Sequence, residues 1–444
     1  MIEQIFTFME AVDELFWWYI GAPSLLIIGS YLSIKSRFFQ IRQFPRIVRI
    51  FKTFARQKDD ASVRGVAPIN AFFASVGGAI GVGNLVSVCF SIQVGGPGAV
   101  FWMWVAALLG MLVKYGEIYL GVKFRIKNNE NSYTGGPMIF LKHVPGGKFW
   151  SVFATILMCL YGIEIYIFRV VTSSICHGWN LNPYLVIPAL LLLVIGVGRG
   201  GVSIVGKICS VVIPFFLAAY LSMGLWVLLQ NIALLPSLFY SIFVHAFTPH
   251  AALGAFAGNT MMLAVSHGVR RACYTGDIGV GYSSTMHAET KESIPARQAA
   301  LGVIDIFLDS FVVCSMSMLL VLISGMWHTC DVPPVFMIAE TLAQYFPYVN
   351  IIWPLFIFLL GYTTMIAFFA AGRRAATILI PTYGVGLYMS FAAILFLLFS
   401  FLGTESQCLA MMSLVGCLLL VCNLYGLFFL KDEIVFDVDH AEKK

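Results

Sequence analysis

Charged residues are scarce in this sequence. Asp, Glu, Lys and Arg make up 11% of the 444 residues, whereas hydrophobic residues make up 59%. A soluble domain is about 25% charged, so the composition excludes an ordinary soluble protein. Apolar runs of about 20 residues recur along the chain, and each is long enough to cross the hydrocarbon layer of a membrane. No β-barrel alternation is visible, so the spans are predicted to be helices.

The motifs of several other protein classes are also missing. The ten cysteines include no Cys-x-x-Cys pair, so the sequence predicts neither disulfides nor a zinc site. No P-loop, H-E-x-x-H, G-x-S-x-G or carboxylate dyad is found, which argues against an ATP-driven pump and against a membrane-embedded enzyme. The N-terminus lacks a basic segment and a small-residue cleavage site, so no cleavable signal peptide is expected.

The apolar runs predict an all-α membrane protein with eleven spans. Their approximate bounds are 14–34, 68–94, 98–122, 150–174, 184–206, 208–230, 236–272, 298–324, 351–371, 376–400 and 408–430. Lys and Arg gather in alternate connections, at 35–64, 123–148, 199–207, 270–297, 373–374 and 431–444. They are absent from the connections between these, at 175–183, 231–235, 325–350 and 401–407. Because cytoplasmic loops are enriched in Lys and Arg, we expect the N-terminus outside and the C-terminal tail in the cytoplasm.

Two of the spans carry helix-breaking residues in their middle. The second span contains GGAIGVGNLVSV at 77–88, and the seventh contains AFTPHAALGAFAG at 246–258. Each glycine weakens a helix by roughly 1 kcal/mol relative to alanine. The two spans lie five spans apart and run in opposite directions across the membrane. Interrupted spans at matching positions of two inverted halves are typical of a secondary transporter, whose binding site uses the freed backbone groups.

Gly81, Gly83 and Asn84 are the residues expected to bind substrate at the first interruption. The N-terminus of a half-helix favours a carboxylate, although close helix packing is the alternative role for such glycines. Glu164 and Arg169 lie in the fourth span, where charge is costly. One could meet the ammonium group of a substrate and the other its carboxylate, or Arg169 could reach the membrane interface instead.

Four other polar residues and one histidine also interrupt apolar sequence. Lys114 and Glu117 are three residues apart, which predicts an intrahelical ion pair. His245 precedes the break of the seventh span, where it could couple protons or act as an ordinary interfacial residue. Thr363 and Thr364 carry hard oxygen donors that could ligate sodium. The alternative is that each hydroxyl bonds to a carbonyl one turn earlier in its own helix.

Several motifs closely resemble the alanine/glycine:cation symporter family. They are GVGNLVSV at 81–88, GGPGAVFWMWVAALLGMLVKYGEIYLGVKFR at 95–125, GGPM at 135–138, HAFTPHAALGAFAG at 245–258, GVRRACYTGDIGVGYSS at 268–284, RQAALGVIDIFLDSFVVCSMS at 297–317 and GYTTMIAFFAAGRR at 361–374. The resemblance covers essentially the whole chain. It implies a leucine-transporter-like fold, and uptake of a small neutral amino acid such as alanine or glycine with sodium as the coupling ion.

The domain organisation follows from this resemblance. It comprises an N-terminal helix with a basic cytoplasmic loop (1–66), a first inverted repeat of spans 2–6 (67–230), a second of spans 7–11 (231–430) and a cytoplasmic tail (431–444). The expected location is the bacterial cytoplasmic (inner) membrane. The basic residues lie in loops beside the membrane, so they do not indicate a nucleic-acid partner. A proton-coupled carrier of a different small amino acid or related zwitterion is the alternative, and a channel is the alternative from another class.

The chain departs from the family pattern where a substrate would be bound. Where the family reads S-N-E-A-G this chain reads TGDIG at 275–279, which we place at the cytoplasmic end of span 7, beside Arg270 and Arg271. Phe368 stands at a usual Trp, and the residues after it are smaller than the usual tyrosines, which predicts a roomier pocket that also admits serine, valine or methionine. The expected substrate contacts are Gly81, Gly83, Asn84, Glu164, Phe168, His245 and Phe368, with sodium at Thr363 and Thr364.

Overall fold

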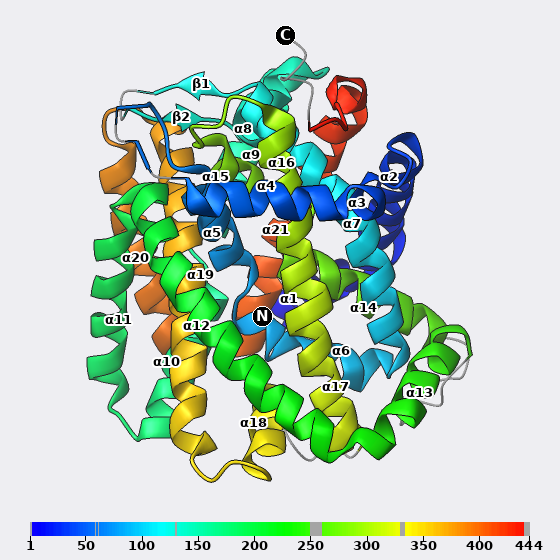
Figure 1. Ribbon diagram of the computed structural model, residues 1–444. Coiled ribbons are helices and arrows are strands. Elements are labelled where there is room, and N and C mark those ends of the chain that lie inside the picture. The colour runs from blue at the N-terminus through cyan, green and yellow to red at the C-terminus, as the bar shows by residue number, and fades with distance from the viewer. Residues whose placement is uncertain are drawn as a thin grey trace.

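Helices dominate the computed structural model, which describes residues 2–57, 59–60, 62–128, 131–248, 260–328 and 334–438. The strand pair β1 (Ile126–Lys127) and β2 (Tyr133–Thr134) is the only sheet found within these ranges. The long helices stand side by side, and α4 lies across one end of them, next to β1 and β2 (Figure 1). The prediction of an all-helical membrane protein is confirmed.

The helices follow one another along the whole chain. They are α1 (Ile2–Phe16), α2 (Ala22–Lys35), α3 (Phe39–Arg42), α4 (Phe44–Arg56), α5 (Pro68–Ala79), α6 (Ser87–Gly95), α7 (Gly98–Lys123), α8 (Pro137–Phe140), α9 (Gly147–Tyr161), α10 (Ile165–Trp179), α11 (Pro183–Gly198), α12 (Gly201–Gln230), α13 (Leu235–Phe247), α14 (Thr260–Gly276), α15 (Tyr282–Ala288), α16 (Pro295–Ile306), α17 (Ser315–Ser324), α18 (Pro334–Ala343), α19 (Val349–Leu379), α20 (Gly384–Leu402) and α21 (Glu405–Leu430). Short π-helices join α1 to α2 (Trp17–Gly21) and α16 to α17 (Phe307–Cys314), and 3₁₀ turns occur at Val82–Asn84, Leu141–His143, Ile232–Leu234, Met326–His328 and Lys431–Glu433.

Helix ends coincide with residues that favour them. Pro68, Pro183 and Pro295 stand in the first turns of α5, α11 and α16, where a missing backbone N–H costs no helical hydrogen bond. Asn180 and Gly325 close α10 and α17 in the left-handed conformation, with φ of 52° and 68°, a conformation that these two residue types tolerate. These signals set the lengths of the spans.

Nine of the eleven predicted spans have a counterpart in the structure. Eight helical stretches of the described chain are long and apolar enough to cross a membrane, and the α5–α6 pair, bent by 52°, makes a ninth. The predicted spans 184–206 and 236–272 coincide with shorter helices, α11 and the α13–α14 pair. The count of eleven therefore stays a prediction.

The first predicted interruption is present. α5 ends at Ala79, Gly81 is extended (φ −132°, ψ −168°), and one 3₁₀ turn leads to α6. Gly77 and Gly78, by contrast, lie inside α5, and a Cβ there would come within 2.4 Å of Cys209 Sγ or of the Tyr282 ring. The two earlier glycines therefore serve close helix packing, and the break begins only after them.

The second interruption lies at residues 277–281, between α14 and α15. Asp277, Gly279 and Gly281 adopt positive φ values of 48°, 75° and 91°, which end one half-helix and start the next. The predicted break at 246–258 lies almost entirely outside the described residues. The sequence TGDIG at 275–279 spans the last turn of α14 and the start of this break. Its position at the cytoplasmic end of a span stays a prediction.

The two interrupted spans are enclosed by other helices. α7 packs against α14 and α16, and α5 packs against α12 and α19. Non-helical backbone is tolerated at membrane depth only where protein or a cavity surrounds it. The packing therefore allows both interruptions to lie in the interior of the molecule.

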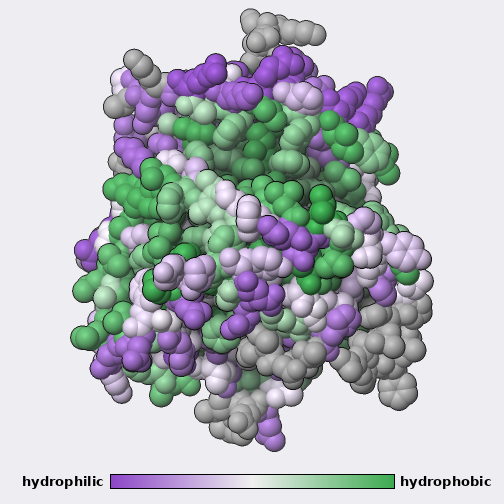
Figure 2. Space-filling view, turned by 60° about the horizontal axis from the view of Figure 1, so that its bottom comes forward, coloured by the Kyte–Doolittle hydropathy of each residue, from purple (hydrophilic) through white to green (hydrophobic). Residues whose placement is uncertain are grey.

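The membrane topology that the charge pattern predicts can be tested by thiol labelling. Figure 2 shows hydrophilic side chains along the upper rim of the molecule and a broad hydrophobic surface below it. We expect Glu340→Cys in α18, whose native side chain is exposed, to react with an impermeant reagent added to intact cells. Arg49→Cys in α4 should react only after permeabilisation, in a background without native cysteines. Labelling of position 49 from outside would invert the topology.

Candidate functional site

A small cavity lies where the two interrupted spans meet. Its volume is about 20 Å³, which is enough for one water molecule. Its walls come from α5 and the turn after it, from α14, from α19 and from the junction of α9 and α10. The α9–α10 junction is a third interruption, at residues 162–164, which the sequence did not reveal. Side chains must move before the cavity can admit an amino acid.

Six of the nine predicted site residues line this cavity. They are Gly81, Gly83, Asn84, Glu164, Thr364 and Phe368. A Cβ on Gly83 would lie 2.9 Å from Nη2 of Arg271, so the backbone at Gly83 faces that guanidinium directly. A side chain at this position would occupy the space between the two groups unless the guanidinium moved aside.

Asn84 holds the turn of the first interruption in place. Its Oδ1 accepts a hydrogen bond from the backbone N–H of Gly81 (3.0 Å), and its Nδ2 donates to Oδ1 of Asp309 (2.6 Å). Asp309 lies in the π-helix between α16 and α17, a local form of helix that is frequent at functional sites. The amide therefore satisfies freed backbone and links the break to a neighbouring span.

Thr364 bridges two spans, whereas Thr363 does not. The Thr364 hydroxyl lies 3.1 Å from the carbonyl oxygen of Gly77 in α5 and 3.0 Å from that of Leu360. A Cβ on Gly81 would lie 2.5 Å from the same hydroxyl. Among the residues that the structure describes, the Thr363 hydroxyl bonds only to carbonyls of its own helix. This agrees with the alternative role, in which a threonine hydroxyl bonds to a carbonyl one turn earlier. Thr364 is thus the better placed of the two to share a cation with the end of α5.

Glu164 projects into the cavity from the α9–α10 junction. Its side chain is buried, and its Oε2 has no hydrogen-bond partner among the described residues. It is the residue before α10 and has an unusual backbone conformation (φ −11°, ψ 60°). A buried carboxylate oxygen without a partner is costly, so this atom is available to a ligand.

Arg271 and Tyr274 complete the polar lining, and sequence analysis missed both. Arg271 is buried, and its Nε and Nη2 have no hydrogen-bond partner in the described structure. The hydroxyl of Tyr274 likewise has none. The charge pattern predicts that Arg271 lies in a loop, because it belongs to the basic residues grouped at 270–297. The sequence offers no signal that separates Arg271 from Arg270, because both belong to the same group of basic residues.

Phe168 and His245, which were predicted to contact substrate, lie outside the central cavity. Arg169, considered as a partner for the substrate, lies outside it as well. The Phe168 ring stacks on Phe396 of α20 at 4.5 Å, so it packs against a neighbouring helix. His245 lies in α13, and its Nδ1 bonds to Ser241 one turn earlier. The guanidinium of Arg169 donates to the carbonyl of Ser400 near the end of α20, where the last carbonyls of a helix need donors. None of the three lines the cavity.

The predicted pair of Lys114 with Glu117 is also wrong. Nζ of Lys114 forms an ion pair with Asp305 of α16 (2.7 Å) and donates to the carbonyl of Gly276, the last residue of α14 (2.8 Å). Glu117 accepts instead from Nδ2 of Asn423 (2.5 Å). Both acids are fully buried, so each needs a partner from another helix. Lys114 thereby places a positive charge at the C-terminal end of a half-helix.

Two further cavities lie between one face of the molecule and the central cavity, and neighbouring cavities share lining residues. The outer one, of about 380 Å³, is bordered by α1, α6, α14, α18 and α21. A smaller one shares Ser87 and Arg270 with it, and shares Arg271 and Tyr274 with the central cavity. Arg270 forms an ion pair with Asp13 of α1. The helix that precedes the predicted repeats therefore borders the access path.

The opposite face is closed by contacts between loops. Arg374 at the end of α19 forms a buried ion pair with Glu289 (2.7 Å). The backbone of Val66 bonds to that of Glu289 (2.8 Å) and Lys291 (2.7 Å). These contacts join the chain entering α5 to the chain leaving α15, so both interrupted spans are tied together at this end.

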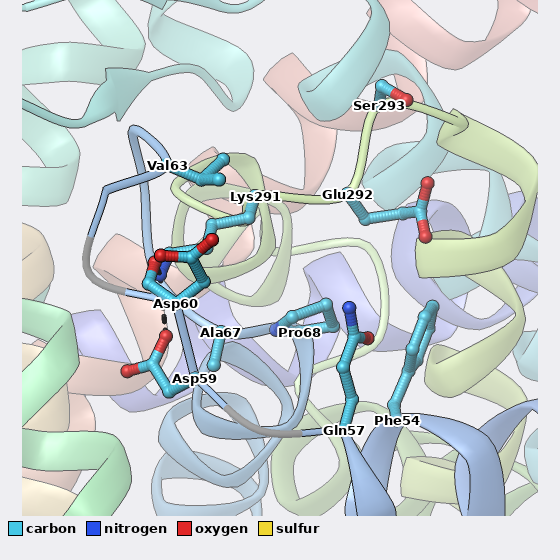
Figure 3. Close-up of a pocket in the computed structure, with 10 residues that line it drawn as sticks. All are labelled: Phe54, Gln57, Asp59, Asp60, Val63, Ala67, Pro68, Lys291, Glu292 and Ser293. Atoms are coloured by element: carbon cyan, nitrogen blue, oxygen red, sulfur yellow. Dashed lines mark hydrogen bonds and ion pairs between the residues drawn. The ribbon is translucent and has the colours of Figure 1, made fainter.

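A further cavity of about 320 Å³ lies in this closed end. Figure 3 shows Lys291 beside Asp59, with which it forms an ion pair (2.5 Å), and Phe54 of α4 and Gln57, which follows α4, along another side. Hydrogen bonds from Ser62 hold the pKa of Asp60 below its usual range. None of its lining residues belongs to the central cavity, so it is separate from the candidate site.

The apolar helices and the interrupted spans define a multi-pass membrane protein. Among solved structures, the fold is similar to MhsT in complex with L-phenylalanine (TM-score 0.52, 15% identity, covering 84% of this chain and 100% of that one). It is also similar to Mhp1, a nucleobase-cation-symport-1 family transporter (TM-score 0.54, 12% identity, covering 79% and 75%). Identities this low show the fold alone.

The chain belongs to the sodium:alanine symporter family, whose model matches residues 2–444. The sodium/alanine symporter AgcS of Methanococcus maripaludis is 28% identical, and the match covers 94% of each chain. An uncharacterized transporter of Haemophilus influenzae is 33% identical over 72% of this chain and 70% of its own. The family and these relatives are transporters, which confirms the resemblance and the prediction that this chain is not an enzyme.

Proposed function

We propose that this protein is a secondary symporter that imports a small neutral amino acid, such as alanine or glycine, together with sodium. The observation that carries the proposal is the central cavity, where the freed backbone of one interrupted span faces polar side chains of another. AgcS, which is similar over nearly the whole chain, is named a sodium/alanine symporter. Family membership and the shape of the site therefore support the same activity.

The proposed sodium site lies beside the end of α5. Thr364 supplies a hydroxyl, and the carbonyl of Gly77 lies 3.1 Å from it. The C-terminal end of a half-helix carries partial negative charge that favours a cation. Thr363 is included in the proposed sodium site because of the family resemblance, although its hydroxyl bonds to a carbonyl of its own helix. The described residues contain no cluster of three His, Cys, Asp or Glu for a metal ion, so hydroxyl and carbonyl oxygens are the donors proposed.

The direction of transport rests on a proposed topology. We propose two inverted repeats, 67–230 and 231–430, in a bacterial inner membrane, with the N-terminus outside. Under this topology the outer cavity bordered by α6 and α18 opens to the exterior, and the ion pair of Glu289 with Arg374 closes the cytoplasmic side. Alternating access then requires the loop contacts at Val66 and Lys291 to separate.

Proton coupling is the second candidate, and buried acids favour it. Asp277, Asp305 and Glu117 are buried, and each has one carboxylate oxygen without a hydrogen-bond partner among the described residues. One ammonium, that of Lys114, lies among them and pairs with Asp305. An excess of buried carboxylates can be balanced by protons. The gradient experiment below separates the two candidates.

Uptake by purified protein in liposomes tests the proposed function. Each of the twenty amino acids is offered under an imposed sodium gradient, and separately under an imposed proton gradient. We expect saturable, sodium-driven accumulation of alanine, glycine or another small neutral amino acid. Accumulation driven only by the proton gradient selects the second candidate. Absence of gradient-driven accumulation of every amino acid contradicts both.

The selectivity of the pocket depends on the ring of Phe368. It lies 4.0 Å from the ring of Tyr282 and 5.2 Å from that of Tyr161, so neighbouring rings fill the space that the predicted roomier pocket required. We expect Phe368→Ala to let valine and methionine compete with the substrate, because it removes a ring from the cavity wall. Phe369→Ala is the control, since Phe369 packs on Tyr388 outside the cavity. Equal competition profiles for the two variants would show that Phe368 does not limit substrate size.

A further inference from the structure

Two buried side chains of opposite charge, Arg271 and Glu164, line the central cavity. Arg271 is 3% exposed and Glu164 is 2% exposed. No ion pair of either appears among the described residues, and both carry polar atoms without a hydrogen bond. A guanidinium and a carboxylate are each expensive to bury alone. The protein therefore presents two charges of opposite sign that a ligand can neutralise.

We propose that Arg271 and Glu164 clamp the two charged ends of one amino acid, with Arg271 binding its α-carboxylate and Glu164 its α-ammonium group. This inference rests on the proposed function and specifies how the same site recognises its substrate. Both residues line the cavity yet do not pair with each other, so a zwitterion between them satisfies both at once. A planar guanidinium suits a carboxylate because it offers two parallel N–H donors.

The surroundings of Arg271 support its assignment to the carboxylate. Nη2 would lie 2.9 Å from a Cβ on Gly83, so the guanidinium faces the backbone that follows the first break. The N-terminal side of a half-helix favours negative charge. The hydroxyl of Tyr274, on the next turn of α14, also lacks a partner and can donate to the same carboxylate. The guanidinium and the tyrosine hydroxyl are therefore two donors that line the same part of the cavity.

The access path fixes the orientation of the ligand. Arg271 and Tyr274 border both the central cavity and the smaller cavity that leads to the outer one, whereas Glu164 borders the central cavity only. The carboxylate of the bound amino acid therefore points toward the access path, and its ammonium group points toward the α9–α10 junction. The side chain is left to face Phe368 and Ile167, which also line the cavity.

The clamp predicts which parts of the ligand each residue recognises. The probes are the amino acid with the strongest uptake and its deaminated and decarboxylated analogues, which for alanine are propionate and ethylamine. Binding is measured at saturating sodium. Wild-type protein should bind the amino acid at least about tenfold more tightly than either analogue, since each analogue loses one charged contact. Equal binding of an analogue by wild-type protein would overturn the clamp.

Substitutions then assign each end. Arg271→Gln should remove the preference over the decarboxylated analogue, and Glu164→Gln should remove the preference over the deaminated one. Arg270→Gln is the matched control, because Arg270 pairs with Asp13 and does not line the central cavity. It should keep both preferences. If both cavity variants keep both preferences, the clamp is wrong.

Folding and the proposed function are controlled separately. Sodium-dependent thermal stabilisation reports whether each variant is folded without using the substrate. If Arg271→Gln does not fold, Arg271→Lys keeps the charge but loses the paired donors, and it should weaken amino-acid binding while ethylamine binding is unchanged. Unchanged amino-acid binding by this variant contradicts the clamp. Failure of wild-type protein to bind any amino acid contradicts the proposed function itself, which distinguishes the two failures.

Discussion

Gly83→Leu is expected to abolish amino-acid uptake while the protein still inserts into the membrane. A Cβ at this position already lies 2.9 Å from Nη2 of Arg271, and the remainder of a leucine side chain would fill the space between the turn and the guanidinium. The cavity has a volume of only about 20 Å³, so a leucine side chain would fill it and prevent a ligand from entering. The measurement is uptake of the best substrate in cells, with the amount of membrane-inserted protein determined in parallel.

A glycine in open surroundings supplies the control. Nothing lies within 4 Å of a Cβ built on Gly196 in α11, so Gly196→Leu should leave uptake close to that of the wild type. Both substitutions add the same side chain to an apolar segment. Uptake at the wild-type rate by Gly83→Leu would show that the turn at residues 81–84 is not part of the substrate site.

Thr364→Val is expected to weaken sodium activation by about tenfold or more, which is the size of effect that follows from losing one polar contact to a charge. Valine keeps the shape of threonine and removes the hydroxyl that lies 3.1 Å from the Gly77 carbonyl. Substrate affinity at saturating sodium should change much less. The measurement is the sodium concentration that gives half-maximal uptake.

Thr363→Val is the adjacent comparison. Its hydroxyl bonds to carbonyls of Leu359 and Leu360 in its own helix, so we expect a smaller shift in sodium activation than for Thr364→Val. Equal shifts would show that both hydroxyls reach the ion. An unchanged sodium dependence in both variants would move the coupling ion elsewhere and direct attention to Asp277 and Glu117.

The spans and the first interruption could be predicted because their signals are local. Apolar length identifies a span by itself, and the cluster that contains Gly81 and Gly83 marks a break wherever the helix lies. Asn84 stands out in the glycine cluster itself, and Thr364 stands out as a polar residue in an apolar span. These four residues meet in one cavity, which the resemblance to a known family implied and periodicity alone did not.

The interruption after α14 could not be predicted because the basic residues just before it indicated a loop. Arg270 and Arg271 follow the charge pattern of a cytoplasmic loop, and the rule that uses this pattern takes no account of burial. The structure instead pairs Arg270 with Asp13 and turns Arg271 into the cavity. Asp277, with φ of 48°, lies at the break itself.

Partners of buried charges could not be predicted either, because they come from distant parts of the chain. Spacing suggested that Lys114 would pair with Glu117, but it pairs with Asp305. The sequence allowed Glu164 and Arg169 to bind the two charged groups of one substrate, but Arg169 bonds to the carbonyl of Ser400. A local rule describes isolated helices. In a packed bundle each charge takes the partner that tertiary contacts bring nearest.

A density map of the protein with sodium and its best amino-acid substrate tests the central claim most directly. The account predicts substrate density in the central cavity, with the carboxylate at Arg271, the ammonium group at Glu164 and the backbone of Gly83 in contact. It also predicts that the side chains around the cavity have moved apart to admit the ligand. Substrate density at another position, with the turn at residues 81–84 unoccupied, would contradict the account.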